Sequence, residues 1–259
     1  MQHKIIGDDV QAVILGMNEG DTIRAEAGAM MYMTTGIEMK TQAGEGKGNG
    51  VMGALLGGAK RMIAGESFFS TTFTATQANQ QIGFAAPYPG KIIPLNLAET
   101  GPMLCQRDAY LCGDVTAHVE MAFTKKLGAG FFGGEGFVLQ KLHGEGTVFI
   151  HSAGGILPFD LVAGQSLKVD TGCLVGMSET VTYDIQMMTG IKNVLFAGEG
   201  LFFAYLTGPG RVYLQTLPFG RMADRIIAAS KLGSGRDSEQ STGVAGLGGK
   251  ILGNILSGQ

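Results

Sequence analysis

The stretch Gly20–Met30, with the sequence GDTIRAEAGAM, decides the fold because the chain contains it more than once. Gly164–Leu174, with the sequence GQSLKVDTGCL, matches it almost position by position at a constant offset of 144 residues. A looser copy begins at Gly101 and runs to Leu111. Repetition of this kind is typical of one supersecondary unit used several times around a shared core. The sequence therefore predicts three copies of one unit.

A second phrase also occurs three times, each time with a glutamate in the same place. Its copies are AGESFF at 64–69, GGEGFV at 133–138 and AGEGLF at 197–202. With both phrases aligned, the copies cover about 1–100, 101–163 and 164–220. The first copy is longer because it contains a Gly-rich insertion at 44–65.

The hydrophobic pattern within the copies is that of strands. Val181–Met187 alternates strictly between apolar and polar residues, and Phe69–Ala75 continues a Phe/Thr-rich run. Period-two alternation is typical of half-buried strands. Gly accounts for 43 of 259 residues and falls between these runs, where chain reversals occur. Short strands between Gly-rich turns indicate an all-β sandwich or barrel.

Composition excludes several classes of protein. The net charge is −3, and Lys and Arg never form a run longer than two residues, so a nucleic-acid partner is not expected. The three cysteines lack metal-ligand spacing and favour free thiols in a reducing, cytoplasmic compartment. No stretch of about 18 apolar residues is present, so no membrane span is predicted.

The copies and a short helix at 221–230 make one predicted domain, 1–230, followed by a Gly-rich linker and an amphipathic tail at 231–259. The insertion 44–65 and the tail segment 244–257 both place apolar residues at helical spacing. We expect both to contact the chain's own core, a neighbouring subunit or a membrane surface. The predicted contact residues are Leu55, Leu56, Met62, Ile63, Leu247, Ile251 and Ile255.

The phrases LGGAKRM at 56–62, AGESFF at 64–69 and FIHSAGGI at 149–156 carry a resemblance to a known family. The chain resembles bacterial members of the altered-inheritance-of-mitochondria, or mitochondrial biogenesis, family over about residues 1–230. The resemblance implies three β-sandwich units like that of the tryptophan RNA-binding attenuation protein, and assembly into a homo-oligomer. The mitochondrial members are linked to cristae complexes of the inner membrane. The family pattern names no catalytic residue.

The glutamates of the second phrase have two interpretations. A pseudo-threefold axis would place Glu66, Glu135 and Glu199 at equal radii, where a small radius would make an acidic ring able to hold a cation. The structural interpretation is favoured, because a Gly precedes each one and Gly-Glu suits a bend. His143 and His151 flank a predicted strand and are interpreted as structural. The sequence predicts no catalytic residue, metal or cofactor.

These observations together favour a non-enzymatic protein with an all-β fold of three tandem units about a pseudo-threefold axis and a short C-terminal helix. Its predicted role is binding or scaffolding as a homo-oligomer, with a protein or a membrane surface as a further partner. A small-ligand binder with a cavity between copies is the first alternative, and a metal-dependent enzyme is the second.

Overall fold

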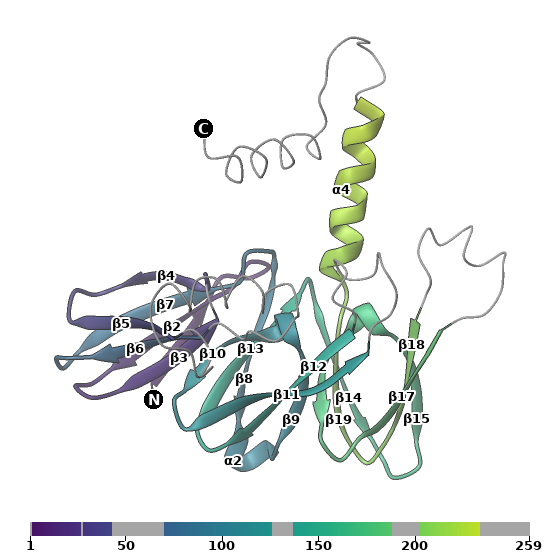
Figure 1. Ribbon diagram of the computed structural model, residues 1–259, viewed down its shortest axis with the longest axis horizontal. Coiled ribbons are helices and arrows are strands. Elements are labelled where there is room, and N and C mark those ends of the chain that lie inside the picture. The colour runs from purple at the N-terminus through teal and green to yellow at the C-terminus, as the bar shows by residue number, and fades with distance from the viewer. Residues whose placement is uncertain (1, 27, 43–69, 126–136, 188–201, 234–259) are drawn as a thin grey trace, which may run out of the picture. The chain divides into compact units, whose positions relative to one another are not determined.

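The computed structural model describes residues 2–26, 28–42, 70–125, 137–187 and 202–233, and their strands form four antiparallel sheets (Figure 1). Sheet A has the order β1 (Gln2–Ile6), β2 (Ala12–Met17), β7 (Gln80–Ala85), β4 (Met30–Met33). Sheet B has the order β5 (Ile37–Gln42), β6 (Ser70–Ala75), β3 (Thr22–Glu26), β10 (Tyr110–Asp114), β13 (Thr147–Ala153), β8 (Gly90–Asn96).

Sheets C and D contain the later strands. Sheet C has the order β11 (Ala117–Lys125), β12 (Phe137–Gly144), β9 (Met103–Gln106), β16 (Leu174–Ser178), β19 (Gly210–Gln215), β14 (Ile156–Leu161). Sheet D has the order β15 (Ser166–Asp170), β18 (Phe202–Thr207), β17 (Thr182–Met187). The predicted all-β fold class is confirmed.

The alternation read from the sequence places side chains as expected. Val181 and Ile185 are buried, and Phe202, Ala204 and Leu206 of β18 are buried while Phe203 and Tyr205 are only partly so. Successive side chains of a strand point to opposite faces, so this pattern buries one face of sheet D and leaves the other partly open.

The same order of strand pairing occurs in three successive groups of six strands: β2–β7, β8–β13 and β14–β19. In each group the sixth strand pairs with the first and third, and the fifth pairs with the second and fourth. Each group begins one strand before the repeated phrase, which lies on its second strand. The pseudo-threefold axis stays a prediction, because strand pairing alone defines no axis.

The groups share sheets. The third strand of the second group, β10, pairs with the second strand of the first group, β3. In the same way β16 of the third group pairs with β9 of the second. Sheets B and C therefore each join three strands of one group to three of the next, whereas sheet D contains strands of the third group only and sheet A contains strands of the first group and β1.

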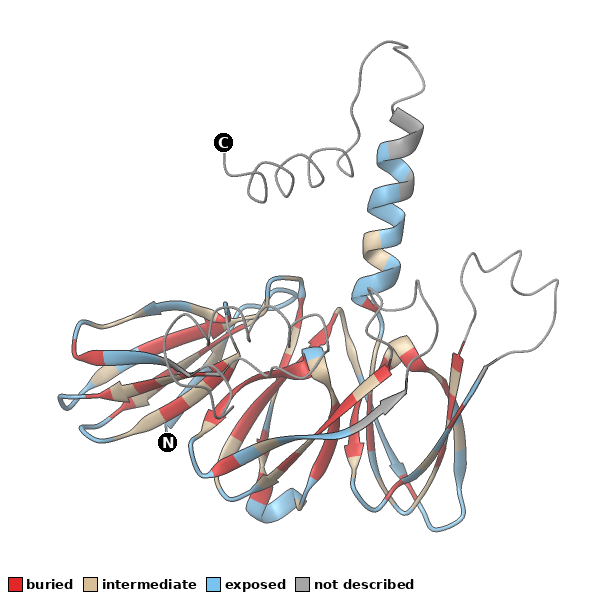
Figure 2. Cartoon of the chain, in the orientation of Figure 1, coloured by how far each residue is buried: buried red, intermediate tan, exposed pale blue. Residues whose placement is uncertain are grey.

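Buried apolar residues form three cores, and each core links two sheets; the buried positions are red in Figure 2. The first contains Phe84 of sheet A and Phe73 of sheet B; the second, Tyr110 of sheet B and Leu142 of sheet C. The third contains Leu139 of sheet C with Leu206 of sheet D. Burial of apolar surface at about 25 cal/mol per Å² is the main force that stabilises this arrangement.

Helix α4, Phe219–Gly233, occupies the segment predicted to be helical. The chain divides into Met1–Gly220 and a second part that begins at Arg221, so most of α4 belongs to the second part. Two of its apolar side chains, Ile226 and Ile227, are exposed. In the part of the chain that the structure describes, no helix is both long enough and apolar enough to span a membrane.

Two glycines of the repeated phrase differ in conformation. Gly28 has φ +87°, in the left-handed region that favours glycine, as its turn position predicts. Gly172 matches Gly28 in the repeated phrase, so the sequence predicts the same conformation there. This prediction is wrong, because the φ of Gly172 lies outside that region. Asp170 explains the difference: its carboxylate accepts a hydrogen bond from Gly172 N at 2.9 Å and caps a short 3₁₀ turn, Thr171–Cys173, instead.

Candidate functional site

The residues predicted as sites from the sequence lie outside the described residues. This applies to the three glutamates of the proposed acidic ring, Glu66, Glu135 and Glu199. It applies equally to the predicted contact residues Leu55, Leu56, Met62, Ile63, Leu247, Ile251 and Ile255. These hypotheses therefore stay predictions, and the candidate site among the described residues lies at the junctions between groups.

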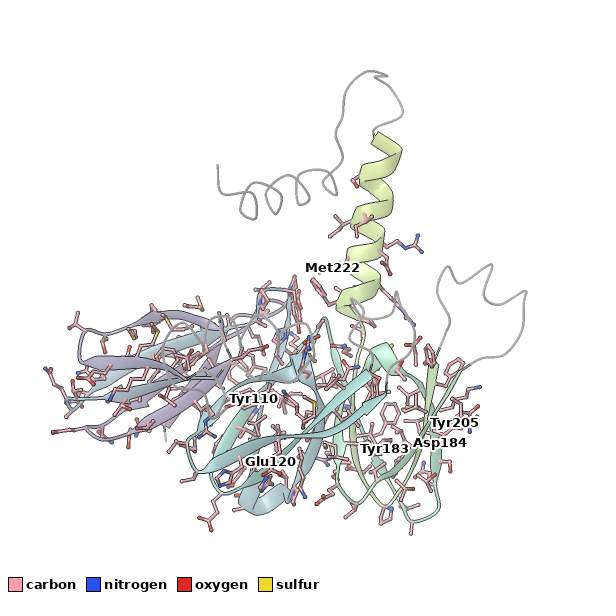
Figure 3. The ribbon with its side chains drawn as sticks, viewed as in Figure 1. Tyr110, Glu120, Tyr183, Asp184, Tyr205 and Met222 are labelled. Atoms are coloured by element: carbon pink, nitrogen blue, oxygen red, sulfur yellow. The ribbon has the colours of Figure 1, made fainter. Side chains whose placement is uncertain are left out.

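At the first junction, strands β10 and β3 pair with Cys112 opposite Ala25, Gly113 opposite Arg24 and Asp114 opposite Ile23. The Tyr110 hydroxyl, on a ring 1% exposed, donates a hydrogen bond to the Arg24 carbonyl at 2.8 Å (Figure 3 labels Tyr110). The pairing continues past the strand ends, where Val115 N donates to the Thr22 carbonyl at 3.3 Å.

The second junction repeats this pattern. Gly176 lies opposite Cys105, Met177 opposite Leu104 and Ser178 opposite Met103. Glu179 N donates to the Pro102 carbonyl at 3.0 Å, as Val115 N does to Thr22 at the first junction. The two junctions therefore have one register, and each residue at one has an equivalent at the other.

A register shift in the third strand of every group marks equivalent positions. It falls between Met30 and Tyr32 in β4, between Tyr110 and Cys112 in β10, and between Leu174 and Gly176 in β16. The bulged residues are therefore Met31, Leu111 and Val175. Leu111 is 2% exposed in the core between sheets A and B, and Val175 is 1% exposed in the core between sheets B and C.

The bulged residue of the first group, Met31, differs from Leu111 and Val175. Met31 is 57% exposed, and its neighbour Tyr32 is 41% exposed, whereas Cys112 at the position equivalent to Tyr32 is fully buried. Among the strands that the structure describes, β4 pairs only with β7, at the edge of sheet A. Sheet A thus presents at this edge the apolar side chains that the other groups bury against a preceding group.

A polar cluster lies at the first junction, where β3 ends. Glu26 has a pKa raised to about 7, mainly because burial disfavours its charge and further because of the nearby Asp108 carboxylate, with Arg107 opposing. The Tyr88 hydroxyl donates to the Asp108 carbonyl at 3.2 Å. At the second junction the position of Glu26 is taken by Gln106, whose amide donates to the Thr171 carbonyl at 2.8 Å.

His151 lies beside this cluster and is 2% exposed, with its ring edge-on to Tyr88 at 4.8 Å between centroids. Neither ring nitrogen has a hydrogen-bond partner among the described residues. Burial lowers its pKa to about 4. The equivalent residue in the third group is Gln215, which accepts from Ala153 N and donates to the Gly172 carbonyl, both at 2.8 Å.

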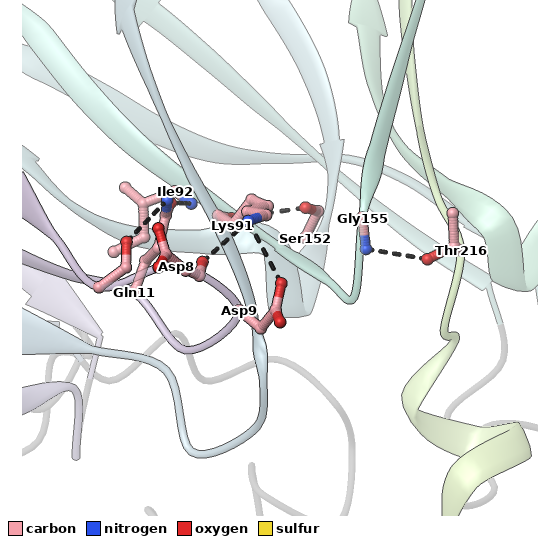
Figure 4. Close-up of polar contacts among 9 residues, drawn as sticks. Asp8, Asp9, Gln11, Lys91, Ile92, Ser152, Gly155 and Thr216 are labelled. Carbon is pink, nitrogen blue, oxygen red and sulfur yellow. Dashed lines mark hydrogen bonds and ion pairs between the residues drawn. The ribbon is translucent and has the colours of Figure 1, made fainter.

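Polar contacts also fix the chain segment that precedes β2 against β8 (Figure 4). Gln11 accepts a hydrogen bond from Ile92 N at 2.8 Å, and Lys91 Nζ donates to the Asp8 carbonyl at 2.9 Å. The Asp9 carboxylate lies 3.5 Å from Lys91 Nζ. The first two groups are therefore held together at this turn by side-chain bonds as well as by β10–β3 pairing.

His118 and His143 lie opposite each other on β11 and β12, with ring centroids 5.3 Å apart. His143 Nε2 is 3.2 Å from the Glu120 carboxylate. The described part of the chain contains no group of three or more His, Cys, Asp or Glu residues placed to hold a metal ion.

Cys105 and Cys112 are buried, and burial raises the pKa of both thiols; Cys173 is partly exposed.

The exposed edge of sheet A was not predicted from the sequence. Its signal was present in the run Met30–Met33, four consecutive apolar residues in one short strand. A strand with apolar residues on both faces is typical of burial on both sides. The equivalent runs in β10 and β16 are buried in this way, and the contrast with β4 becomes visible only once the sheets are assembled.

Comparison with known proteins places this architecture in a family. The chain matches the mitochondrial biogenesis AIM24 family over residues 3–217. An uncharacterized protein of Streptococcus pyogenes serotype M6 is 30% identical over 216 residues, which cover 83% of this chain and 84% of that protein. A crystal structure of a Streptococcus pyogenes protein superposes with a TM-score of 0.71 at 25% identity, and covers 88% of this chain and 99% of that one. The chain therefore belongs to the mitochondrial biogenesis AIM24 family.

Proposed function

We propose that this protein is a non-enzymatic β-scaffold that acts as an oligomer of identical chains. One observation carries the proposal: Met31 and Tyr32 are 57% and 41% exposed at the edge of sheet A, although their equivalents in the other two groups are buried. An exposed strand edge with apolar side chains is prone to pair with another chain, and natural proteins cover or disrupt such edges. A further copy of this chain would cover it.

The alternatives have weaker support. In the described part of the chain, a cluster of buried apolar side chains lies in each core between sheets, such as Phe73 and Phe84 with ring centroids 5.5 Å apart. This packing favours a scaffold over a binder with a cavity between copies. Glu26 and His151, the two residues at the junction whose pKa values are shifted, lie between two groups of strands. Burial is the main cause of both pKa shifts. A structural role for them agrees with the non-enzymatic proposal.

A peripheral position at a membrane remains part of the proposal for the C-terminal tail. Its support is the sequence, which places Leu247, Ile251 and Ile255 at helical spacing next to Lys250. Binding to vesicles with and without anionic lipid, by full-length protein and by a chain ending at 235, tests this part separately. Loss of binding in the shortened chain is the expected result, and equal binding by both chains contradicts it.

Light scattering after size exclusion tests the oligomer. The native chain at micromolar concentration is expected to elute with a multiple of the chain mass. Met31→Asp should shift the mass towards the monomer, because it places a charge in the surface that association would bury. A monomeric native chain at that concentration would contradict the proposal.

Val162→Asp is the matched control, because Val162 is 69% exposed in a turn outside sheet A. It adds the same charge at a comparably exposed apolar residue. The control variant is expected to keep the native mass, and circular dichroism should show both variants folded. Equal loss of mass in both variants would point to a general charge effect and against the edge of sheet A.

A further inference from the structure

We propose that copies of this chain join head to tail, with β4 of one copy pairing antiparallel to β15 of the next, so that sheets D and A become one sheet like B and C. This inference rests on the proposed function, since it names the surfaces through which the oligomer forms. It goes beyond that function by fixing the partner strand, the direction and the register.

The composition of the sheets identifies the partner strand. Sheets B and C each join the first, sixth and third strands of one group to the second, fifth and fourth strands of the group before it. Sheet A holds the first, sixth and third strands of the first group, with β1 at its far edge, and sheet D holds the second, fifth and fourth strands of the third group. The two part-sheets are therefore the two complementary halves of one such sheet.

Both edges are incomplete in the same way. In sheet D, β15 pairs only with β18 among the described strands, just as β4 pairs only with β7 in sheet A. Leu167 of β15 is partly exposed, while its equivalents Ile23 and Met103 are 0% and 1% exposed. Both β4 and β15 thus expose apolar side chains whose equivalents in the other groups are buried.

The two internal junctions define the register. Cys112 opposite Ala25 and Gly176 opposite Cys105 are equivalent pairs. The residues of β4 and β15 at these positions are Tyr32 and Val169. The intermolecular pairs are therefore Tyr32 with Val169, Met33 with Lys168 and Thr34 with Leu167, and the amide of Thr35 would donate to the Ser166 carbonyl.

This register also places the bulged methionine. Leu111 enters the core between sheets A and B, and Val175 enters the core between sheets B and C. In the same arrangement Met31 would enter the core between sheets C and D of the neighbouring copy. Leu167, Cys173 and Leu214 are only partly buried at the margin of that core and would be covered by it.

The interface joins two different surfaces, so it is heterologous. Such contacts generate a closed ring if the rotation between copies closes, and an open filament if it does not. They also predict that no residue of the interface meets its own copy across a twofold axis. This property separates the proposal from a symmetric β4–β4 dimer.

Cysteine cross-linking tests the register in a Cys173→Ser background, which removes the native thiol that is partly exposed. A Tyr32→Cys chain and a Val169→Cys chain, with different tags, are co-expressed and oxidised. Directly opposed residues of antiparallel strands have Cα atoms about 4.5–5.5 Å apart, within disulfide range. The expected product is a mixed, disulfide-linked dimer, and each variant expressed alone should give none.

The matched control pairs Tyr32→Cys with Leu167→Cys, two residues out of register. That diagonal separation is about 7–8 Å, too long for a disulfide, so no dimer is expected. Met33→Cys with Lys168→Cys is a second in-register pair, and it keeps the test decisive if Val169→Cys fails to fold.

The outcomes separate this inference from the proposed function. An oligomer by light scattering without cross-links at either in-register pair overturns the register and keeps the scaffold. Cross-linking of Tyr32→Cys to itself also overturns it, in favour of a symmetric dimer. A link confined within one chain in a Tyr32→Cys/Val169→Cys double variant overturns it too, because β4 and β15 would then close on each other. A native chain that is monomeric overturns both proposals.

Discussion

Leu111 and Met31 occupy the same bulged position of their strands, yet Leu111 is 2% exposed and Met31 is 57% exposed. Leu111 packs in the core between sheets A and B, against residues of the preceding group. Among the strands that the structure describes, none pairs with the outer edge of β4, and Met31 lies in no core there. The difference between these two residues is the reason to expect that the array of groups continues into another molecule.

We predict that Leu111→Ala and Met31→Ala have very different effects on stability. Leu111→Ala should lower the free energy of unfolding by about 2–5 kcal/mol, since it leaves a cavity in a packed core. Met31→Ala should change it by less than about 0.5 kcal/mol in the monomer, as surface substitutions do. Urea denaturation of each variant, at a concentration where the chain is monomeric, measures both values, and similar losses would contradict this reading of the groups.

Glu26 should make the protein less stable as the pH rises. Its pKa is raised from 4.5 to about 7 by folding, so the folded state binds more protons than the unfolded state between these values. The contribution of this group is fully present below pH 4.5 and is lost as the pH rises through 7. The loss amounts to about 3 kcal/mol.

Glu26→Gln should remove this loss, because Gln106 shows that an amide fits the equivalent position and donates to a carbonyl there. Thermal unfolding from pH 5 to pH 8 measures it. The stability of the variant relative to the native chain is expected to increase as the pH rises. Glu38→Gln, at an exposed residue of β5, serves as the control. Parallel curves for the native chain and Glu26→Gln would show that the Glu26 pKa is not raised.

His151 should have the opposite effect on the acidic side. Folding lowers its pKa from 6.5 to about 4, so its contribution is present above pH 6.5 and is lost as the pH falls towards 4. The loss by pH 4 is about 2–3 kcal/mol. His151→Gln, which introduces the residue that the third group has at this position, should remain folded and lose this acid sensitivity. An unchanged decline between pH 6.5 and 4 would assign the acid sensitivity to other groups.

Gly28 should tolerate substitution less well than Gly172. Gly28→Ala puts a side chain at φ +87°, which costs about 1–2 kcal/mol although no atom lies within 4 Å of the new Cβ. A Cβ at Gly172 would meet only the Asp170 carboxylate at 3.3 Å and Pro218 at 3.5 Å, with no left-handed strain. Chemical denaturation of the two alanine variants compares the costs, and a larger loss of stability for Gly172→Ala than for Gly28→Ala would contradict this prediction.

Local features of the fold could be predicted from the sequence. The alternation in Val181–Met187 gives β17, and the apolar pattern after Gly220 gives α4, because strand and helix periodicity are properties of neighbouring residues. The recurring phrase marks the second strand of each group. It did not indicate that each group begins with the strand before the phrase. At Gly172 the same phrase gave a wrong prediction, because the Asp170 carboxylate accepts a hydrogen bond from Gly172 N and caps a short 3₁₀ turn there.

The sequence by itself determined that this chain is built of short strands with Gly turns, used repeatedly, since these facts depend on residues close together in the chain. Only the tertiary structure decided which strands of different groups pair, because β3 and β10 are brought together by packing that no local pattern encodes. The raised pKa of Glu26 likewise depends on burial and on Asp108, a residue distant in sequence. The exposure of Met31 follows from the same cause: burial of a strand's second face depends on the group that packs against it, and among the described strands none pairs with the outer edge of β4.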